Sequence, residues 1–442
     1  MNSSPRFAAL LEKAPPELLE RLIGLGKTID DRAYAPWAEL AYRVAPEGLR
    51  PEEYWLALQI KRAANRIDLT QLTAKSGRPM QLNLTPRMHA VLRRIERAMP
   101  QGVDPNLRDT PTDAPSRYRV SALMEEAIHS SLFEGAVSTV DAAKEMLRSQ
   151  ARPLDLSAQM IVNNYRAMQQ IVAWRDLPLS VNRLLDLQRI LTENTLDQHA
   201  VGRFQTAEDV RVMLVSKTRS KPVFEPPHAH EIAQRIAALI EFANAPDDEE
   251  ELIPPIVRAI LVHYGLAYIH PFQDGNGRTA RALFYWVMLA RGYRIAEYLA
   301  ISRQILAQPK QYLESFEHAQ ADEDDVTYFV LHQLTVIEAS FGYLHRYLER
   351  KREELKALDG FTRFSARFNA RQRAAVSYAV RHPGATFTAI SHQTSHQISN
   401  NTAKADLKEL SDWALLERKR VGTKDLYQVP LNFIQRLKRF KG

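Results

Sequence analysis

The chain has 442 residues, more than one hydrophobic core usually supports, so we expect two or three domains. Its 45% apolar content is ordinary for a globular protein, and its lack of cysteine excludes disulfides, cysteine-based zinc sites and a cysteine nucleophile. Lys and Arg exceed Asp and Glu by 59 to 52, a moderate excess that is unevenly spread along the chain.

Membrane and zinc signals are missing from the sequence. No apolar run approaches the length of a membrane span, and the first residues lack a signal-peptide pattern. The histidines show no HExxH-type spacing. We therefore expect a cytoplasmic protein with no membrane contact and no zinc.

The first 99 residues or so carry mainly the pattern of amphipathic helices. Residues 54–58, which include an aromatic pair, are an example and fit a packed helix face. Four prolines and Gly102 break the pattern between residues 100 and 115 and predict a linker. We expect an N-terminal helical region over residues 1–115 that packs on the domain after it.

A helical pattern over residues 122–129 runs into the hexapeptide Ser130-Ser131-Leu132-Phe133-Glu134-Gly135. A Glu-Gly pair at a helix end is common, so this hexapeptide predicts little by itself.

Two apolar or β-branched runs, 210–215 and 223–224, flank a polar stretch and predict a short hairpin. The stretch holds no Asn-Gly or Gly-Gly turn, and an ordinary surface hairpin fits it equally well. The acidic run 247–251 then predicts a solvated loop whose last acids favour the N-terminus of the next helix.

The most informative segment is residues 270–281, HPFQDGNGRTAR. Apolar residues before it predict a buried helix that begins at Pro255 and that Pro271 ends near His270. Residues 278–291 predict a second helix that stops at Gly292. The Gly-Asn-Gly run between them therefore lies at a helix N-terminus, where unpaired N–H groups and the helix dipole attract anions.

The polar residues of this segment suit phosphate chemistry. Arg278 and Arg281 are three residues apart, so they share a helix face and can both bind a polyphosphate. Asp274 supplies one oxygen ligand, which suffices for Mg²⁺ beside substrate phosphates. His270 can accept a proton near neutral pH. Taken singly, such residues are usually caps, turns or core; together they predict Mg²⁺-dependent phosphoryl or nucleotidyl transfer to a hydroxyl.

Residues 270–281 are similar, position for position, to the HPFx(D/E)GNGRxxR signature of Fic-domain proteins. The resemblance implies a mainly α fold with a helical Fic core. It also implies transfer of AMP from ATP to a Ser, Thr or Tyr hydroxyl of a protein target, or of the protein itself, with release of pyrophosphate. ATP would be the substrate and Mg²⁺ the cofactor.

The resemblance assigns a role to each residue of the signature. His270 would be the general base, Asp274 the Mg²⁺ ligand and Phe272 the buried anchor of the loop. The residues implied to bind the phosphates are Gly275, Asn276 and Gly277 as a backbone nest, with Arg278 and Arg281 on the β- and γ-phosphates.

Two more features take on meaning from the family. A hairpin flap at the position of residues 210–224 would pair with the backbone of the target and leave sequence preference loose. Tyr312 lies where family members often place an aromatic side chain near the adenine, although a Tyr at this spacing is also a common core residue. Asp325 is a reasonable N-cap for a core helix near this point.

The hexapeptide at 130–135 resembles the inhibitory (S/T)xxxE(G/N) motif of Fic proteins that restrain themselves. Glu134 would pair with Arg281 and so misplace the terminal phosphates of ATP, which prevents in-line attack. An auto-inhibited adenylyltransferase is therefore expected. The resemblance also allows Glu134 to help water remove AMP from a modified target, and the sequence leaves this open.

The C-terminal part has a different pattern. We expect helices over 369–380, from 386 and over 399–410, followed by strands at 415–418 and 426–429, which together resemble a winged helix. Eight Lys or Arg against two acids after residue 415 permit a nucleic-acid contact. The residues that would face outward at the start of the third helix are Ser399, Asn400, Asn401 and Lys404. Winged helices also bind proteins or dimerise, so DNA and a homodimer both stay open as partners.

The expected architecture is thus an N-terminal helical region (1–115), a Fic core with the inhibitory helix and a small hairpin flap (116–350), and a winged-helix domain (360–442). One alternative is a DNA-binding regulator that uses the Fic core to sense a nucleotide. Another is a Fic enzyme that removes AMP, and a third uses a different nucleotide or a phosphocholine carrier as donor.

Overall fold

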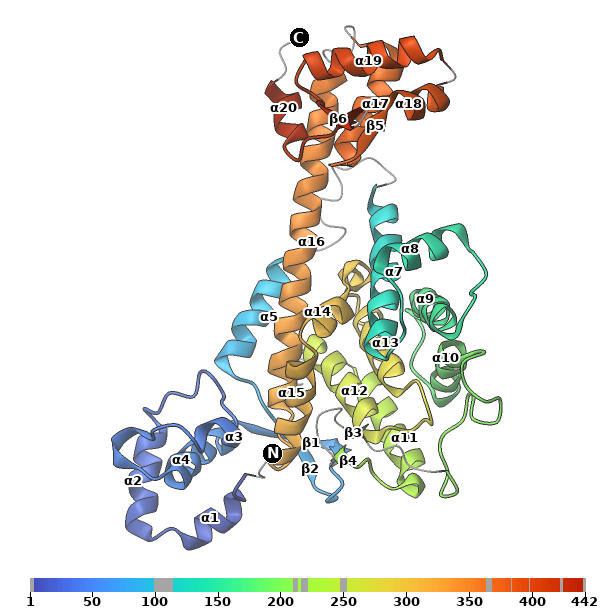
Figure 1. Ribbon diagram of the computed structural model, residues 1–442. Coiled ribbons are helices and arrows are strands. Elements are labelled where there is room, and N and C mark those ends of the chain that lie inside the picture. Colours follow the sequence, from blue (N-terminus) through green and yellow to red (C-terminus); the bar gives the residue numbers. More distant parts are fainter. Residues whose placement is uncertain are drawn as a thin grey trace. The chain divides into compact units, whose positions relative to one another are not determined.

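A computed structural model describes residues 4–98, 114–209, 214–215, 222–246, 253–362, 368–382, 384–396, 398–421 and 424–439. The chain divides into two compact units, Met1–Gly342 and Tyr343–Gly442, and the boundary falls within a long helix, α16 (Thr327–Thr362). The described chain is mainly helical with three small antiparallel sheets, which confirms the expected fold class (Figure 1). None of its described helices combines the length and apolarity needed to cross a bilayer.

The first unit begins with a small helical group packed around Trp55, which is fully buried. Its elements are α1 (Phe7–Lys13), α2 (Pro16–Gly26), α3 (Trp37–Leu40), η1 (Pro46–Gly48) and α4 (Pro51–Ala63). Prolines at the first turns of α2 and α4 fit helix starts, where a missing N–H costs nothing.

The helical expectation for residues 1–99 was wrong over one stretch. Residues 66–83 form a hairpin of β1 (Arg66–Thr73) and β2 (Pro79–Asn83), which precedes α5 (Pro86–Ala98). Leu69 and Leu72 of β1 are buried, and β1 lies against α11 (Ile232–Asn244). The turn residue Gly77, with φ +81°, was the available signal for a hairpin here. The linker expected over 100–115 lies mostly outside the described residues, and Pro115 falls inside α7 (Ala114–Phe133).

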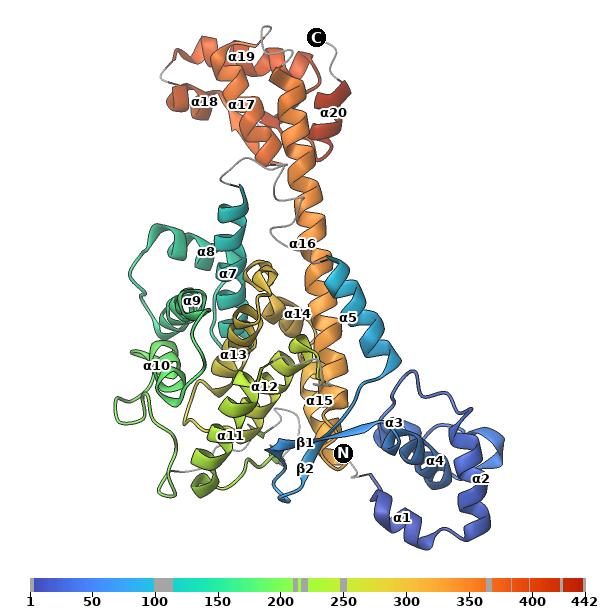
Figure 2. The ribbon, with the colours of Figure 1, turned by 180° about the vertical axis from the view of Figure 1, so that it is seen from behind.

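The core of this unit surrounds α12 (Pro255–Ile269), a helix with 13 of its 15 residues buried. A helix that is apolar on every side needs cover on every side. Figures 1 and 2 show α12 between α11 and α13 (Asn276–Ala290), which both pack on it. The remaining elements are α8 (Val140–Ser149), α9 (Leu156–Trp174), α10 (Val181–Thr192), β3 (Leu214–Val215), β4 (Pro222–Phe224), η2 (Ala229–Glu231), η3 (Arg294–Tyr298), α14 (Ile301–Ala307) and α15 (Pro309–Ala321).

The second unit has its own core of apolar side chains, among them Phe368, Leu407 and Tyr427. Its elements are α17 (Ala370–Arg381), β5 (Thr386–Thr388), α18 (Ala389–His396), α19 (Asn400–Asp412), β6 (Glu417–Val421), β7 (Lys424–Gln428) and α20 (Phe433–Arg439). The sheet has the order β5-β7-β6 and is antiparallel. Residues 386–388, expected to begin a helix, are instead a strand, because β7 offers them a pairing edge; the helix begins at Ala389.

Candidate active site

The loop at residues 270–275 is held between two helix ends. His270 ends α12 in the left-handed region (φ 51°, ψ 55°), and its N–H donates to the Leu266 carbonyl at 2.9 Å. This is the αL type of C-cap, and it lets the chain turn sharply into the following proline. The sequence predicted both the stop at His270 and the helix start at Pro255, which is the first residue of α12.

Phe272 is the buried anchor that the sequence suggested. Its ring has no exposed surface and lies 5.5 Å from the ring of Phe204. The Asn276 side chain accepts from the Phe272 N–H at 2.9 Å and donates to the Phe272 carbonyl at 2.6 Å. This clamp fixes the Asn276 side chain against the loop and leaves its backbone N–H at the start of α13 available to a phosphate.

The N-terminus of α13 requires glycine at two positions, each for a different reason. Gly275 is the N-cap with φ 83°, a conformation that side chains rarely adopt. Gly277 is helical, but a Cβ atom placed on it would lie 2.1 Å from Glu134 Oε1 and 3.1 Å from Arg281 Nη1. A carboxylate oxygen therefore already lies over the helix N-terminus, at the place where an anion is expected to bind.

Arg278 and Asp274 form an ion pair beside this N-terminus. Arg278 Nη2 donates to Asp274 Oδ2 at 2.9 Å, and its Nη1 donates to the Leu191 carbonyl at 2.9 Å. The Arg278 side chain is buried, whereas that of Asp274 is 51% exposed. Asp274 thus presents carboxylate surface to solvent next to the glycine-lined helix end.

A dedicated metal cage is not part of the described chain: nowhere in it do three or more His, Asp or Glu side chains gather as ligands. Magnesium often takes only one or two carboxylates and completes its shell with phosphate oxygens and water. The half-exposed Asp274 beside an anion-binding helix end fits that donor set.

Arg281 is almost fully buried and is held from the end of α7. Its Nε donates to Ser130 Oγ at 2.9 Å, and its Nη2 donates to the Ser130 carbonyl at 3.1 Å and to Glu134 Oε1 at 2.8 Å. Burial disfavours the charged guanidinium, but the nearby Glu134 carboxylate raises the pKa of Arg281 above its usual value. The ion pair expected between Glu134 and Arg281 is therefore present.

The end of α7 is fixed to α9 by short polar contacts. The Ser131 hydroxyl donates to the Ala127 carbonyl at 2.8 Å and lies 3.3 Å from the Met160 carbonyl. Asn164 on α9 donates to Ser131 Oγ at 3.3 Å. Glu134 directly follows Phe133, the last residue of α7, and Gly135 comes next with φ 102°.

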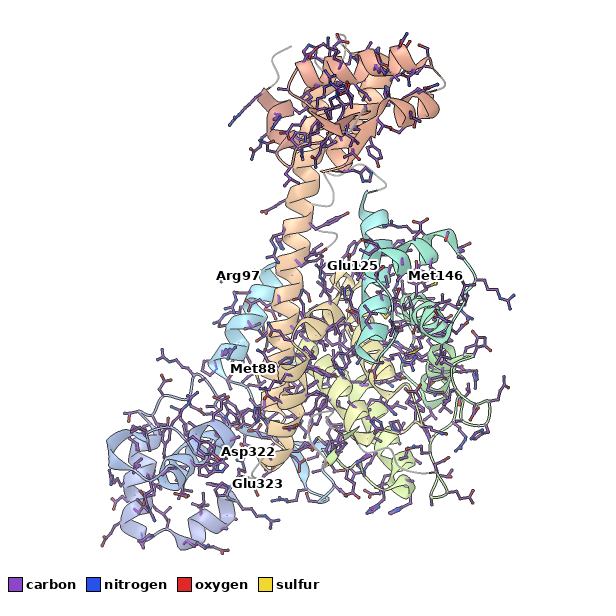
Figure 3. The ribbon with its side chains drawn as sticks, viewed as in Figure 1. Met88, Arg97, Glu125, Met146, Asp322 and Glu323 are labelled. Atoms are coloured by element: carbon purple, nitrogen blue, oxygen red, sulfur yellow. The ribbon has the colours of Figure 1, made fainter. Side chains whose placement is uncertain are left out.

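A buried carboxylate ties the middle of α7 to α14. Glu126 accepts hydrogen bonds from the Ser302 N–H at 2.9 Å, from the Ser302 hydroxyl and from the Tyr285 hydroxyl at 2.8 Å. Burial raises the pKa of Glu126, while these hydrogen bonds and the charge of Arg281 oppose the shift. Its neighbour Glu125, labelled on α7 in Figure 3, pairs with Lys144 at 2.5 Å.

Tyr312 lies in an aromatic cluster of the core. Its ring packs at about right angles to Phe133, 5.4 Å away, and to Phe316, 5.2 Å away. Its hydroxyl lies 3.0 Å from His263 Nε2, and the side chain is nearly fully buried. This environment matches the core alternative for a tyrosine at this position, and an adenine contact stays a prediction.

The hairpin expected near residues 210–224 is described only in part. Leu214 pairs with Phe224 and Val215 with Pro222, while residues 210–213 and 216–221 lie outside the described residues. Phe224 rests on Tyr268 of α12 at a ring distance of 5.1 Å, so β4 is attached near the C-terminal end of that helix. The acidic run at 247–251 is also outside the described residues.

Sequence reasoning missed several residues that hold the site. Glu126 and His263 belong to helices whose patterns were read only for apolar periodicity, and Ser130 was named as part of the hexapeptide but without its contact to Arg281. A signal existed for Glu126, which together with Glu125 interrupts the otherwise apolar stretch 122–128. His263 lies about two helical turns before the signature, and nothing local marked its partner 49 residues later.

Comparison with known proteins identifies the central part of this unit. Residues 178–288, which run from just before α10 to near the end of α13, match the Fic/DOC family. This part of the chain is a Fic domain. The inhibitory-type hexapeptide at 130–135 lies before the matched residues.

Curated relatives of the Fic domain carry the name protein adenylyltransferase. The fic-1 proteins of Caenorhabditis briggsae and Caenorhabditis elegans are each 30% identical to this chain over 115 residues, which is 26% of this chain and 20% of each relative. The chain therefore spans about a fifth of the length of these relatives.

A solved structure shares the fold beyond the Fic domain. The crystal structure of a Fic family protein from Desulfovibrio desulfuricans G20 has a TM-score of 0.51 and 19% identity, and the match covers 78% of this chain and 97% of that one. This likeness shows the fold alone, and the roles of the site residues remain predictions.

Proposed function

We propose that this protein is a protein adenylyltransferase that its own Glu134 holds inactive. One observation carries the proposal: a carboxylate oxygen lies over the glycine-lined N-terminus of α13 and 2.8 Å from Arg281. A helix N-terminus with a buried arginine attracts anionic ligands, and here an anion of the chain itself is in that place. Displacing Glu134 would make room for the terminal phosphates of ATP.

The reaction uses the signature residues as follows. A target hydroxyl oxygen forms a bond to the α-phosphorus of ATP, the bond from that phosphorus to the α,β-bridging oxygen breaks, and pyrophosphate leaves. His270 accepts the hydroxyl proton. Backbone N–H groups at Gly275–Gly277 and the Arg278 and Arg281 guanidiniums bind the phosphates. Magnesium held by Asp274 would neutralise phosphate charge.

Glu134 would inhibit the transfer by changing the geometry of the bound phosphates. Arg281 cannot bind the γ-phosphate while it is paired with Glu134, so ATP would bind with its phosphates displaced from the line of attack. The hairpin of β3 and β4 would pair with the backbone of the protein target. The target segment would therefore bind as an extended strand that carries a Ser, Thr or Tyr hydroxyl. Glu134 remains the candidate for activating water if the protein also removes AMP.

A labelling experiment tests the activity. The Glu134→Gly protein is incubated with Mg²⁺ and ATP labelled at either the α- or the γ-phosphate. We expect protein-bound label from the α-position only, and none when His270→Ala is added. Label from the γ-position would indicate a kinase, and no label on the protein or on candidate targets would contradict the proposal.

The second candidate function, a DNA-binding regulator, rests on the C-terminal unit. Ser399, the N-cap of α19, is exposed, as are Asn401 and Lys404 on its first turns, whereas Asp406 and Leu407 are buried. Helix, strand, two helices and a two-stranded hairpin follow in the order of a winged helix, whose third helix contacts bases. Retention of duplex DNA that weakens steeply with salt, without any AMP transfer, would favour this function. A homodimer through the same unit would instead change the mass in solution without DNA.

A further inference from the structure

Polar contacts between α7 and α13, which pack side by side, recur at intervals of four residues along both helices (Figures 1 and 2). The positions on the α7 side are Glu126, Ser130 and Glu134, the last in the turn directly after the helix. The positions on the α13 side are Gly277, Arg281 and Tyr285. Residues four apart lie on the same side of a helix, so each series forms one row.

The two rows meet and run in opposite directions. Glu126 Oε2 accepts from the Tyr285 hydroxyl at 2.8 Å, which we call the inner contact. Ser130 Oγ accepts from Arg281 Nε at 2.9 Å. Glu134 Oε1 accepts from Arg281 Nη2 at 2.8 Å, which we call the outer contact. The outer contact is therefore the last of a series that fixes α7 against α13.

The inner contact has more partners and less exposure than the outer one. Glu126 is 1% exposed, and besides Tyr285 it accepts from the Ser302 N–H at 2.9 Å and from the Ser302 hydroxyl. Ser302 belongs to α14, so this carboxylate joins three helices. The Glu134 side chain is 31% exposed and pairs with Arg281. The inner contact can therefore stay closed while a phosphate displaces Glu134.

A fixed α7 keeps the outer contact strong. A charged group that a rigid helix holds beside its partner acts at a high effective concentration, which falls when the helix can move. Glu126 lies eight residues before Glu134, about 12 Å along the helix axis, so it does not contact the anion-binding end of α13. Loss of the inner contact should therefore weaken the ion pair of Glu134 and Arg281 without altering the phosphate site itself.

We propose that Glu126 is a positioning residue that sets how strongly Glu134 competes with the terminal phosphates of ATP for Arg281. The proposal rests on the proposed function, which identifies the ligand as ATP. It assigns the strength of the inhibition to a carboxylate outside the inhibitory hexapeptide, and it predicts that Glu126 acts only while Glu134 is present.

The test is a double-mutant cycle in the full-length chain. Glu126→Ala is made in the parent and in Glu134→Gly, and calorimetry measures the binding of ATP with Mg²⁺ and of AMP. The matched control is Glu125→Ala. Glu125 is the adjacent carboxylate on α7, is 8% exposed, and pairs with Lys144 on α8 and Arg303 on α14.

In the parent we expect Glu126→Ala to tighten ATP binding about fivefold, a typical coupling between side chains of one network. AMP binding should not change, because AMP lacks the phosphates that compete with Glu134. In Glu134→Gly the same substitution should change neither affinity, and Glu125→Ala should change neither in both backgrounds.

Three results would overturn the proposal. The first is no tightening of ATP binding by Glu126→Ala in the parent, and the second is an equal change in the parent and in Glu134→Gly. The third is an equal tightening by Glu125→Ala, which would assign the effect to a general loosening of α7.

Glu126→Ala leaves buried donors without their acceptor, so Tyr285→Phe is the second variant in case the first does not fold. It removes the hydroxyl from the inner contact and leaves Glu126 its hydrogen bonds to Ser302. It should tighten the binding of ATP, and not of AMP, in the parent alone. An unchanged affinity for ATP would overturn the proposal here too.

Binding and transfer fail separately in this design. Selective tightening by Glu126→Ala, without any AMP transfer by Glu134→Gly, would support the positioning role and contradict the adenylyltransferase. If Glu134→Gly bound ATP no more tightly than the parent, Glu134 would not compete with the phosphates, and both proposals would be contradicted.

Discussion

Two arginines of the first unit are almost equally buried, yet their surroundings differ. Arg62 on α4 is 3% exposed and Arg281 on α13 is 1% exposed. Arg62 makes two 2.8 Å hydrogen bonds to Asp31, a 2.8 Å bond to the Tyr328 hydroxyl and a 3.0 Å bond to the Ala35 carbonyl, and it lies 3.9 Å over the Tyr34 ring. Asp322 is a second carboxylate, 3.7 Å away.

Arg281 has a single carboxylate within ion-pair distance in the described structure, and that carboxylate is replaceable. Glu134 directly follows the last residue of α7, its side chain is 31% exposed, and a glycine at 277 makes room for it. Arg62 is instead enclosed by partners from residues 31, 35, 322 and 328 that are themselves buried or nearly so. Burial of an arginine therefore does not mark a ligand site, whereas burial beside an exchangeable anion does.

The largest effect is expected from removing the proposed general base, His270. In Glu134→Gly protein, His270→Ala should lower AMP incorporation by about 10²–10⁴-fold, because a general base contributes that much. The thermal midpoint should hardly change, since His270 lies at the half-buried end of a helix. If incorporation persisted at the parent rate, another group would have to remove the hydroxyl proton. The site beside Arg281 would then not be the place of the reaction.

Arg62→Met tests whether Arg62 serves only the stability of the fold. It leaves Asp31 and Asp322 without their buried cation, and breaking such a pair typically costs about 3–5 kcal/mol of the free energy of unfolding. Denaturant unfolding measures this loss, and ATP binding to the folded fraction should stay the same. A variant as stable as the parent, or one that binds ATP more weakly while folded, would show that Arg62 is not the structural counterpart of Arg281.

Gly277→Ala tests the space at the helix end. The new methyl group would meet the Glu134 carboxylate and would occupy the same room in the ATP-bound state. In the Glu134→Gly background we expect AMP incorporation to fall about a hundredfold, as for a misplacement of about 1 Å. The control is Gly24→Ala on α2, where a Cβ would meet nothing within 4 Å. If Gly277→Ala retained the parent rate, the phosphates would have to bind elsewhere.

The smallest effect concerns Asp322, labelled near the start of α16 in Figure 3. Burial, and then the charge of Asp325, raises the pKa of Asp322 from 3.8 to about 6. The folded chain thus binds this proton more tightly than the unfolded chain, so stability should fall as the pH rises from about 4 to about 6. Thermal midpoints across this range should fall less in Asp322→Asn than in the parent. A steeper fall in the variant would contradict the assignment.

The parts of this molecule that the sequence predicted are those set by neighbouring residues. Through local backbone limits, Pro255 marks the start of α12, Pro271 its end and Gly275 the start of α13, so the loop between these helices was predictable. The ion pair of Glu134 and Arg281 was expected from the family resemblance and not from spacing.

What the sequence did not predict depends on contacts between distant segments. The strand β1 was read as helix because its alternation is short and its cover, α11, is more than 150 residues away. The Arg62 network joins residues 31 and 322, and the His263–Tyr312 pair joins two helices. No local pattern reports such pairings, because each partner is an ordinary polar residue in its own helix or turn.

The central claim is that Glu134 occupies the place of the terminal phosphates. The most direct test compares AMP incorporation by the parent and by Glu134→Gly at saturating ATP and Mg²⁺. The mass of each protein is the readout. A rise of at least about tenfold, equal to about 1.4 kcal/mol of the activation barrier, is predicted. Equal incorporation by the two proteins would contradict the account.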